Sequence, residues 1–265
     1  MISLFSRSLL LIAASSVMAA VLTPAVSTAA IQSRSKSNSS PVAAPELGIR
    51  AIPMKQTLAV LDLPFENRIA ALKAQGPGGY KNLRSIMFDP KSKIDSRWRS
   101  TTAVGRLGGP LSLPELERAA KADVWELRSA ALIAVSRFDR QSASKWSRAL
   151  LKDKALLVRL TAVETLESIQ DRGAIPQLWA ELQSKQNFKR SQSLFIRRRI
   201  VEALAKLEGS GSEDRFVALL EDSDPKLHVP AITALERLTG RSLGKPTDPL
   251  ARRRALWQQW QVTRG

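Results

Sequence analysis

Apolar residues between positions 120 and 240 recur with the spacing of helices. Small and branched residues repeat three, four and seven positions apart, which places them on one helix face. The clearest example is residues 158–169 followed by 171–182, two short amphipathic segments joined by an Asp/Gly turn. Because one such pair of helices cannot bury its apolar stripe alone, we expect it to stack on copies of itself.

A basic residue leads each copy of this pattern, with the spacing R-x-x-A-x-x-x-L. The leading residues are Arg128, Arg159, Arg197 and, with histidine in the arginine position, His228. They follow one another at steps of 31, 38 and 31 residues. The pattern therefore predicts a tandem array of helix pairs, with an extra loop at 184–193 in the longer step.

Cap and turn residues recur together with these leading residues. Asp123, Asp153 and Asp224 precede the first helices of their pairs, and Asp224-Pro225 fits an N-cap followed by proline at the first helical position. The expected second helices are 143–151, 174–182 and 213–220. Weaker pairs are expected at 97–107 with 113–121, and at 65–73 with 80–88.

This combination resembles the HEAT repeat, especially the short HEAT-like repeats also found in phycobilin lyase subunits. The resemblance is clear over residues 120–240 and is best at 153–182. It implies an all-α fold, a right-handed α-α superhelix of about five to six helix pairs over residues 53–240, with second helices lining a concave face. An ordinary helical bundle with chance periodicity is the alternative.

The resemblance also implies a role for the leading residues. In such repeats the arginine typically reaches a carboxylate or a carbonyl group of the neighbouring pair. We therefore expect Arg128, Arg159 and Arg197 to be structural links between repeats. His228 occupies the same position, so we expect it to make a structural hydrogen bond instead of acting as a catalytic base.

The C-terminal residues, 241–265, are predicted to form a capping loop and helix. Leu238-Thr-Gly240, followed by Trp257 and Trp260, resembles the last unit of many bacterial HEAT-repeat proteins, in which a closing helix follows an L-T-G turn. That helix is expected at 249–261. Terminal repeats need a cover over their apolar end, so the two tryptophans are expected to close the core instead of binding a ligand.

Residues 1–30 have the pattern of a secretory signal peptide. Arg7 provides a short positive region, residues 9–20 are apolar, and residues 27–30 are small, as at a cleavage site. Residues 31–52, rich in Ser, Ala and Pro, predict a flexible linker. The chain has no cysteine, which suits an exported bacterial protein. We expect the periplasm or cell envelope, with an uncleaved membrane anchor as the alternative.

The charge of the chain predicts an anionic partner or surface. The formal net charge is +17, and removing residues 1–30 takes away only Arg7, which lowers it by one to +16. The candidate partner-binding residues are the basic side chains outside the repeat pattern and two tryptophans of second helices. They are Lys189, Arg190, Arg198, Arg199, Arg252, Arg253, Arg254, Trp146 and Trp179. The tryptophans either point outward as contact residues or inward as core.

The inventory of reactive residues argues against an enzyme. With no cysteine and only one histidine, the chain has no Cys/His pair, no zinc cluster and no histidine-rich metal site. Carboxylates at 213–214 and 221–224 are expected to cap helices. Gly76-Pro-Gly-Gly79 lacks the Lys-Ser/Thr ending of a phosphate loop and is expected to be a turn between helices. We expect no cofactor.

The sequence thus favours a non-enzymatic scaffold or adaptor for protein–protein interaction in a bacterial envelope. The first alternative is a polyanion-binding protein that uses the basic clusters to hold an anionic lipid, a cell-wall polymer or nucleic acid. Export makes nucleic acid the least accessible of these. An enzyme on a HEAT scaffold is the remaining alternative.

Overall fold

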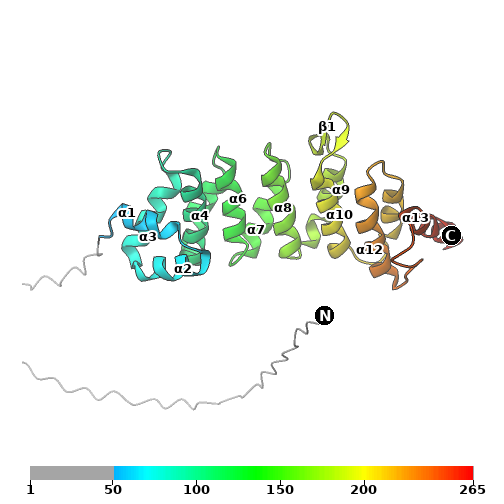
Figure 1. The fold of residues 1–265 in the computed structure, drawn as a ribbon, viewed down its shortest axis with the longest axis horizontal. Helices are drawn as coiled ribbons and strands as arrows, with labels where there is room; N and C mark the ends of the chain where they lie inside the picture. Colours follow the sequence, from blue (N-terminus) through cyan, green and yellow to red (C-terminus); the bar gives the residue numbers. More distant parts are fainter. Residues whose placement is uncertain (1–50, 265) are drawn as a thin grey trace, which may run out of the picture. The chain divides into compact units, whose positions relative to one another are not determined.

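The computed structural model describes residues 51–264, and these residues form one all-α unit. Figure 1 shows the helices in a row, in which each packs on its neighbours in space. This arrangement confirms the HEAT-like solenoid. The predicted signal peptide, 1–30, and residues 31–50 of the predicted linker lie outside the described residues.

The repeating part consists of two layers of helices. One layer, here called the arginine layer because its helices carry the leading residues, contains α4 (Ile94–Gly108), α6 (Trp125–Val135), α8 (Leu156–Ser168), α10 (Phe195–Leu207) and α12 (His228–Thr239). The second layer contains α5 (Leu113–Ala120), α7 (Arg140–Leu150), α9 (Ile175–Leu182) and α11 (Glu213–Ala218). The row begins with α1 (Met54–Leu61), α2 (Phe65–Ala74) and α3 (Gly76–Phe88), and it ends with α13 (Leu250–Arg264).

Short 3₁₀ segments complete several of the turns. They are η1 (Gly109–Ser112), η2 (Arg172–Ala174), η3 (Lys185–Asn187), η4 (Leu219–Glu221) and η5 (Pro225–Leu227). Asp224 caps the last of these, since its side chain accepts a hydrogen bond from the backbone N–H of Lys226. The predicted cap at Asp224-Pro225 is therefore confirmed.

Contacts between helices show which neighbours form a pair. Each second-layer helix packs mainly on the arginine-layer helix that follows it: α5 on α6, α7 on α8, α9 on α10 and α11 on α12. The expected pair, residues 158–169 with 171–182, forms two helices, but they pack on each other less than each packs on its other neighbour. The predicted pairing was therefore shifted by one helix: each second-layer helix pairs with the arginine-layer helix that follows it and not with the one before it. A repeat period in the sequence does not show which of the two flanking helices a given helix packs on.

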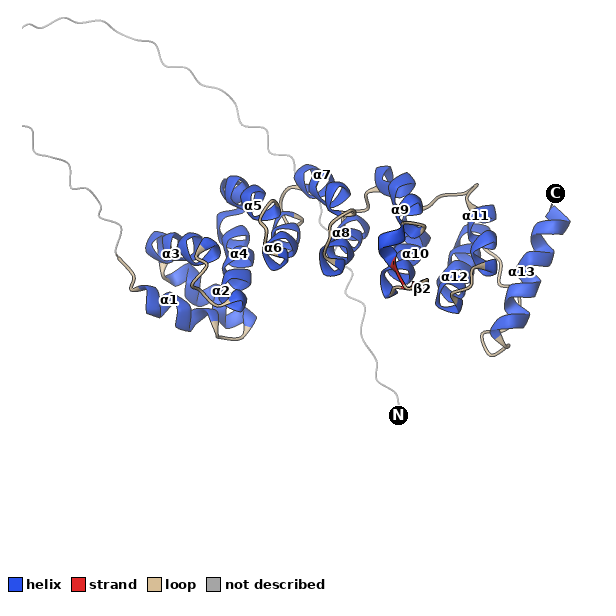
Figure 2. Ribbon diagram, turned by 90° about the horizontal axis from the view of Figure 1, so that it is seen from above, coloured by secondary structure: helices blue, strands red, loops and turns tan. Residues whose placement is uncertain are grey.

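The two layers also differ in how closely their helices lie. Neighbouring arginine-layer helices pack on one another along the row, whereas second-layer helices make little contact with each other. In a curved stack, the more closely spaced layer lies on the inner side, and Figure 2 shows the two layers edge-on. The arginine layer is therefore the inner one, and the expectation that second helices line the concave face is corrected.

Small residues allow this close approach inside the arginine layer. Ala131, Ala162 and Ala231 occupy the fourth position of the repeat pattern and are fully buried. At Gly105 in α4, an added Cβ atom would lie 2.6 Å from the Cβ atom of Ala134 in α6. The seam between α4 and α6 therefore has no room for a side chain at position 105.

Helix α13 closes the far end of the row. It packs on α11 and α12, Trp257 is fully buried, and the ring of Trp260 meets that of Trp257 edge-on at 5.3 Å. Both tryptophans contribute to the core, as expected for a cover over the last repeat. Gly240, with φ at +66°, ends α12 in the left-handed conformation that glycine adopts without strain.

One local prediction was wrong, and another feature is more ordered than predicted. Gly76-Pro-Gly-Gly79 is the first turn of α3 and not a turn between helices, because proline in the first turn of a helix has the required φ and needs no N–H partner there. The extra loop at 184–193 contains strands β1 (Phe188–Lys189) and β2 (Gln192–Ser193), paired antiparallel. Arg190 and Ser191 between them both have positive φ, as a two-residue hairpin turn requires.

We predict that Gly105→Val destabilises the protein by about 1 to 3 kcal/mol, the usual cost of overpacking a core. The new side chain would force α4 away from α6. Gly209→Val is the matched control, because a Cβ atom there meets no heavy atom within 4 Å. Urea unfolding measures both, and equal stability of the two variants would contradict the close approach.

Candidate partner-binding surfaces

A row of buried hydrogen bonds, here called the arginine ladder, runs along the edge where the arginine-layer helices begin. Its first step is Arg128 with Asp153. Arg128 donates from Nε and Nη2 to the two carboxylate oxygens of Asp153, at 2.7 Å each. Its Nη1 donates to the carbonyl oxygens of Ala122 and Asp123. Both charged side chains are buried, and four of the five N–H donors of the guanidinium group make these hydrogen bonds.

The last step of the arginine ladder is Arg197 with Asp222. Arg197 Nη2 lies 2.6 Å from Asp222 Oδ2, Nη1 lies 3.2 Å from Oδ1, and Nε donates to the carbonyl oxygen of Leu182. The carbonyl oxygen of Asp222 accepts a hydrogen bond from His228 Nε2 at 2.9 Å. His228 thus holds the loop that carries the carboxylate, and it is buried there.

The middle step replaces the carboxylate with an amide. Arg159 Nε donates to Asn187 Oδ1 at 3.0 Å, and Nη2 donates to the carbonyl oxygen of Gln186 at 2.8 Å. Asn187 Nδ2 in turn donates to the carbonyl oxygen of Glu181. Burial lowers the pKa of Arg159, and the carboxylates of Glu181 and Asp153 act in the opposite direction. The loop insertion therefore supplies a neutral partner where the other steps have an ion pair.

These contacts confirm the structural role predicted for Arg128, Arg159 and Arg197. Sequence reasoning placed Asp153 before a helix and Asp222 among capping carboxylates, but it did not pair them with the arginines. A signal was present: each acid lies 25 residues after its arginine partner. Charges held in this way are unavailable to a ligand, so the arginine ladder is not a binding site.

Arg198 and Arg199, two of the candidate partner-binding residues, make ion pairs on the helix surface. Arg198 Nε lies 2.7 Å from Glu202 Oε1. Arg199 is hydrogen-bonded to Glu202 and lies within 4 Å of carboxylate oxygens of Glu164 and Glu167 on α8. The two arginines share Glu202, and Arg199 extends this ionic network from α10 to α8. The network can form because α8 and α10 pack side by side in the arginine layer.

The remaining basic candidates lie in two places. On α13, Arg253 is paired with Glu236 at 3.1 Å and Arg252 lies 3.8 Å from Asp248, while Arg254 is half-buried. At the hairpin, Lys189 and Arg190 are exposed, and neither takes part in an ion pair within residues 51–264. The hairpin tip is therefore the more accessible of the two cationic sites.

The two tryptophan candidates have different environments. Trp146 in α7 is buried, with 9% of its surface exposed, so the inward alternative applies to it. Trp179 in α9 is half-buried: Nε1 donates to Glu208 Oε1 at 2.6 Å and its ring meets Phe216 edge-on at 5.3 Å. The guanidinium group of Arg215 lies 5.6 Å from the Trp179 ring centroid. Trp179 therefore links neighbouring repeats and lines a groove of about 600 Å³.

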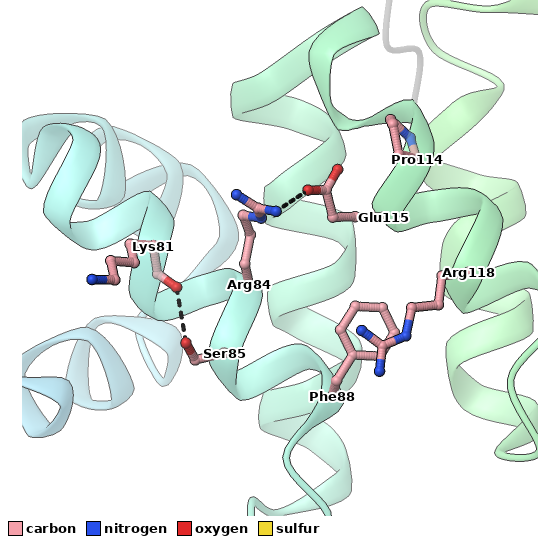
Figure 3. Close-up of a pocket in the computed structure, with 7 residues that line it drawn as sticks. All are labelled: Lys81, Arg84, Ser85, Phe88, Pro114, Glu115 and Arg118. Carbon is pink, nitrogen blue, oxygen red and sulfur yellow. Dashed lines mark hydrogen bonds and ion pairs between the residues drawn. The ribbon is translucent and has the colours of Figure 1, made fainter.

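A groove that sequence reasoning missed lies between α3 and α5. Figure 3 shows Arg84 directed toward Glu115 and Arg118 stacked over Phe88. Arg84 Nη2 lies 2.5 Å from Glu115 Oε1, and the Arg118 guanidinium carbon lies 4.0 Å from the Phe88 ring centroid. The groove measures about 420 Å³, is open to solvent and contains one carboxylate. It offers shape and charge to a partner, and no pair of acids for proton transfer.

Metal-dependent catalysis and acid catalysis each place requirements on the side chains of the described residues. Within residues 51–264, no group of three or more histidine or acidic side chains is placed to hold a metal ion. The hydrogen bond from Arg148 lowers the pKa of Asp171. An acid catalyst at neutral pH would need a raised carboxyl pKa.

No helix in this part of the chain is long and apolar enough to cross a membrane.

Residues 124–195 match the family model of HEAT repeats. The match begins just before α6 and ends at the first residue of α10, so it contains the first two steps of the arginine ladder. It supports a HEAT-repeat protein, and HEAT repeats generally serve as scaffolds for protein interaction. No curated protein matches the chain to a significant degree.

We predict that Asp153→Asn lowers the free energy of unfolding by about 3 to 5 kcal/mol, because it leaves the cation of Arg128 buried without its counter-charge. Glu117→Gln breaks the exposed pair with Lys121 and should cost much less, because solvent screens that pair. Urea unfolding at pH 7 compares the two variants. A loss of similar size in both would contradict the role given to the arginine ladder.

A pH dependence should follow from Asp171, whose carboxylate accepts hydrogen bonds from Arg148 and Ser144. Its folded-state pKa is lowered, so the unfolded chain takes up its proton first as the pH falls. The stabilisation is therefore present above the unfolded pKa of about 3.9 and is lost as the pH falls through the folded pKa.

Asp171→Asn should accordingly be less stable than wild type at pH 7, and the difference should shrink below pH 4. Unfolding free energies measured at intervals between pH 7 and pH 2 test this. A difference that stays constant over that range would show that the carboxylate contributes no proton-linked stability.

Proposed function

We propose that this protein is a non-enzymatic scaffold or adaptor that binds partner proteins on its helical surface. The observation that carries this proposal is the way the buried charges are used. The arginine ladder joins neighbouring repeats by bidentate contacts such as Arg128 with Asp153, so the stack presents one continuous surface. The cavities along it are open grooves, which suit extended partners better than small substrates.

The location that we propose is a bacterial periplasm or cell envelope. It is supported by the signal-peptide pattern of residues 1–30 and by the absence of cysteine. A chain tethered to the membrane by an uncleaved N-terminal segment would present the same helical surface to the same compartment. Sequencing the N-terminus of the protein recovered from cells distinguishes the two, because cleavage places it near residue 31.

A second candidate function is the binding of polyanions, and the hairpin favours it. Lys189 and Arg190 are exposed at its tip, and the chain has a formal net charge of +17. Attraction of this kind is sequence-independent and weakens as salt increases. Arg198, Arg199 and Arg253 contribute less to it, because carboxylates already neutralise them.

Affinity capture from envelope extract, at about 0.05 M and 0.3 M salt, separates the two functions. We expect wild type, Lys189→Ala/Arg190→Ala, and a control of equal charge, Arg241→Ala/Lys245→Ala, to retain the same protein at both salt concentrations. Polyanion binding instead predicts nucleic acid or anionic polymer that is released by salt and lost only with the hairpin variant. That result would overturn the scaffold proposal.

A further inference from the structure

The arginine layer exposes a large apolar side chain at or next to the first residue of every helix. The residues are Ile94 in α4, Trp125 in α6, Leu157 in α8, Phe195 in α10 and Val229 in α12, and each is 38–50% exposed. Each is the first or second residue of its helix. They account for half of the ten exposed large hydrophobic residues in the described part of the chain, and we call them the apolar row.

The core of the repeats does not require these side chains. Val124, Leu156 and Leu194, the immediate chain neighbours of three row members, are partly buried and pack against the core. The row members lie beyond them and remain accessible to solvent. Exposed large apolar side chains that gather at one edge of a soluble protein commonly mark an interaction site.

The middle of the edge that carries the apolar row is also positively charged. The loops that lead into α8 and α10 hold the exposed basic residues Lys152, Lys154, Lys185, Lys189 and Arg190. The loops that lead into α4, α6 and α12 hold lysines and also the acids Asp89, Asp123, Glu221 and Asp224. The ladder carboxylates Asp153 and Asp222 on the same edge are neutralised by their arginines. Helices α8 and α10 have no acidic residue in their first turn, whereas α4 has Asp95 and α6 has Glu126 there. The positive dipole ends of α8 and α10 therefore add to the charge at the middle of the edge.

The spacing of the row indicates the form of its partner. Packed helices lie about 8 to 10 Å apart, and this sets the distance between neighbouring row members. Residues seven apart on an α-helix are about 10.5 Å apart, whereas residues on one face of a strand repeat every 7 Å or so. A helix with an apolar residue at every seventh position therefore fits the row better than an extended segment.

We propose that the apolar row binds an acidic amphipathic helix of a partner protein, laid across the beginnings of the arginine-layer helices. Its apolar residues would contact the row, with Trp125 and Phe195 as aromatic anchors, and its acidic residues would face the lysines of the loops. This inference rests on the scaffold function proposed above and names the partner's chemistry.

Charge argues against the two occupants that this chain could itself provide. A second copy would bring one lysine-rich edge against another, and like charges would oppose the contact. Residues 31–50 contain Arg34, Lys36 and Arg50 but only one acid, Glu46, so they do not complement the edge either. The hairpin, which projects beside the start of α10 in Figure 1, adds two further cations there.

The test uses a fluorescent 28-residue helical peptide with leucine at every seventh position and glutamate on the opposite face. We expect it to bind the full chain, and a version with lysine in place of glutamate to bind at least tenfold more weakly. Leu157→Ser/Phe195→Ser should weaken binding of the acidic peptide at least tenfold. Leu111→Ser/Val262→Ser, which changes two highly exposed apolar residues outside the row, should leave it unchanged.

A charge reversal, Lys152→Glu/Lys154→Glu, should weaken binding of the acidic peptide and strengthen binding of the lysine peptide. Urea unfolding of each variant verifies that it is folded. Failure of the acidic peptide to bind, or equal binding by the row and control variants, would overturn the proposal.

Two further probes distinguish other ligands. If vesicles of phosphatidylglycerol or single-stranded DNA bind in a row-dependent manner while the peptide does not, the partner chemistry proposed is wrong. If the peptide fails but wild type and Leu157→Ser/Phe195→Ser still capture the same envelope protein, the scaffold stands and only the row's role fails. If neither peptide nor protein is captured, the scaffold function fails as well.

Discussion

The bidentate contact between a buried arginine and an aspartate of the next repeat is the interaction on which the stack depends. A guanidinium group taken out of water must have its donors satisfied and its charge balanced. Arg128 and Arg197 meet both needs by reaching a carboxylate 25 residues ahead and a carbonyl group behind. The same contact therefore fixes the spacing of the repeats and the direction in which the arginine-layer helices begin.

The geometry of the arginine ladder also decides what remains for a partner. The ladder uses the buried charges, and the Arg198 and Arg199 network uses several exposed ones. What it leaves at the same edge is a series of first-turn apolar residues and, in the loops before α8 and α10, exposed basic side chains. Repetition places these groups at intervals set by helix packing, so the surface suits a long partner better than a small ligand.

Much of the fold followed from sequence because it depends on local pattern. The R-x-x-A-x-x-x-L spacing located α6, α8, α10 and α12, and the two tryptophans near the C-terminus identified the closing helix. Other features could not be predicted because the local sequence allows two conformations or two side-chain orientations. Gly76 to Gly79 could form a turn or begin a helix, and Trp146 could face in or out. Such choices are decided by packing partners that lie far away in the sequence.

The sequence by itself determined that arginine-led helices repeat and stack, since helix periodicity and the need to bury an apolar stripe are properties of the chain. The tertiary structure decided which helices pair, which layer lies inside and which charges are free. Arg198 and Lys189 belong to equally basic clusters, yet only Arg198 lies beside a neighbouring carboxylate. The alignment of first-turn apolar residues into one row likewise exists only after stacking, because successive members are about 30 to 40 residues apart in the chain.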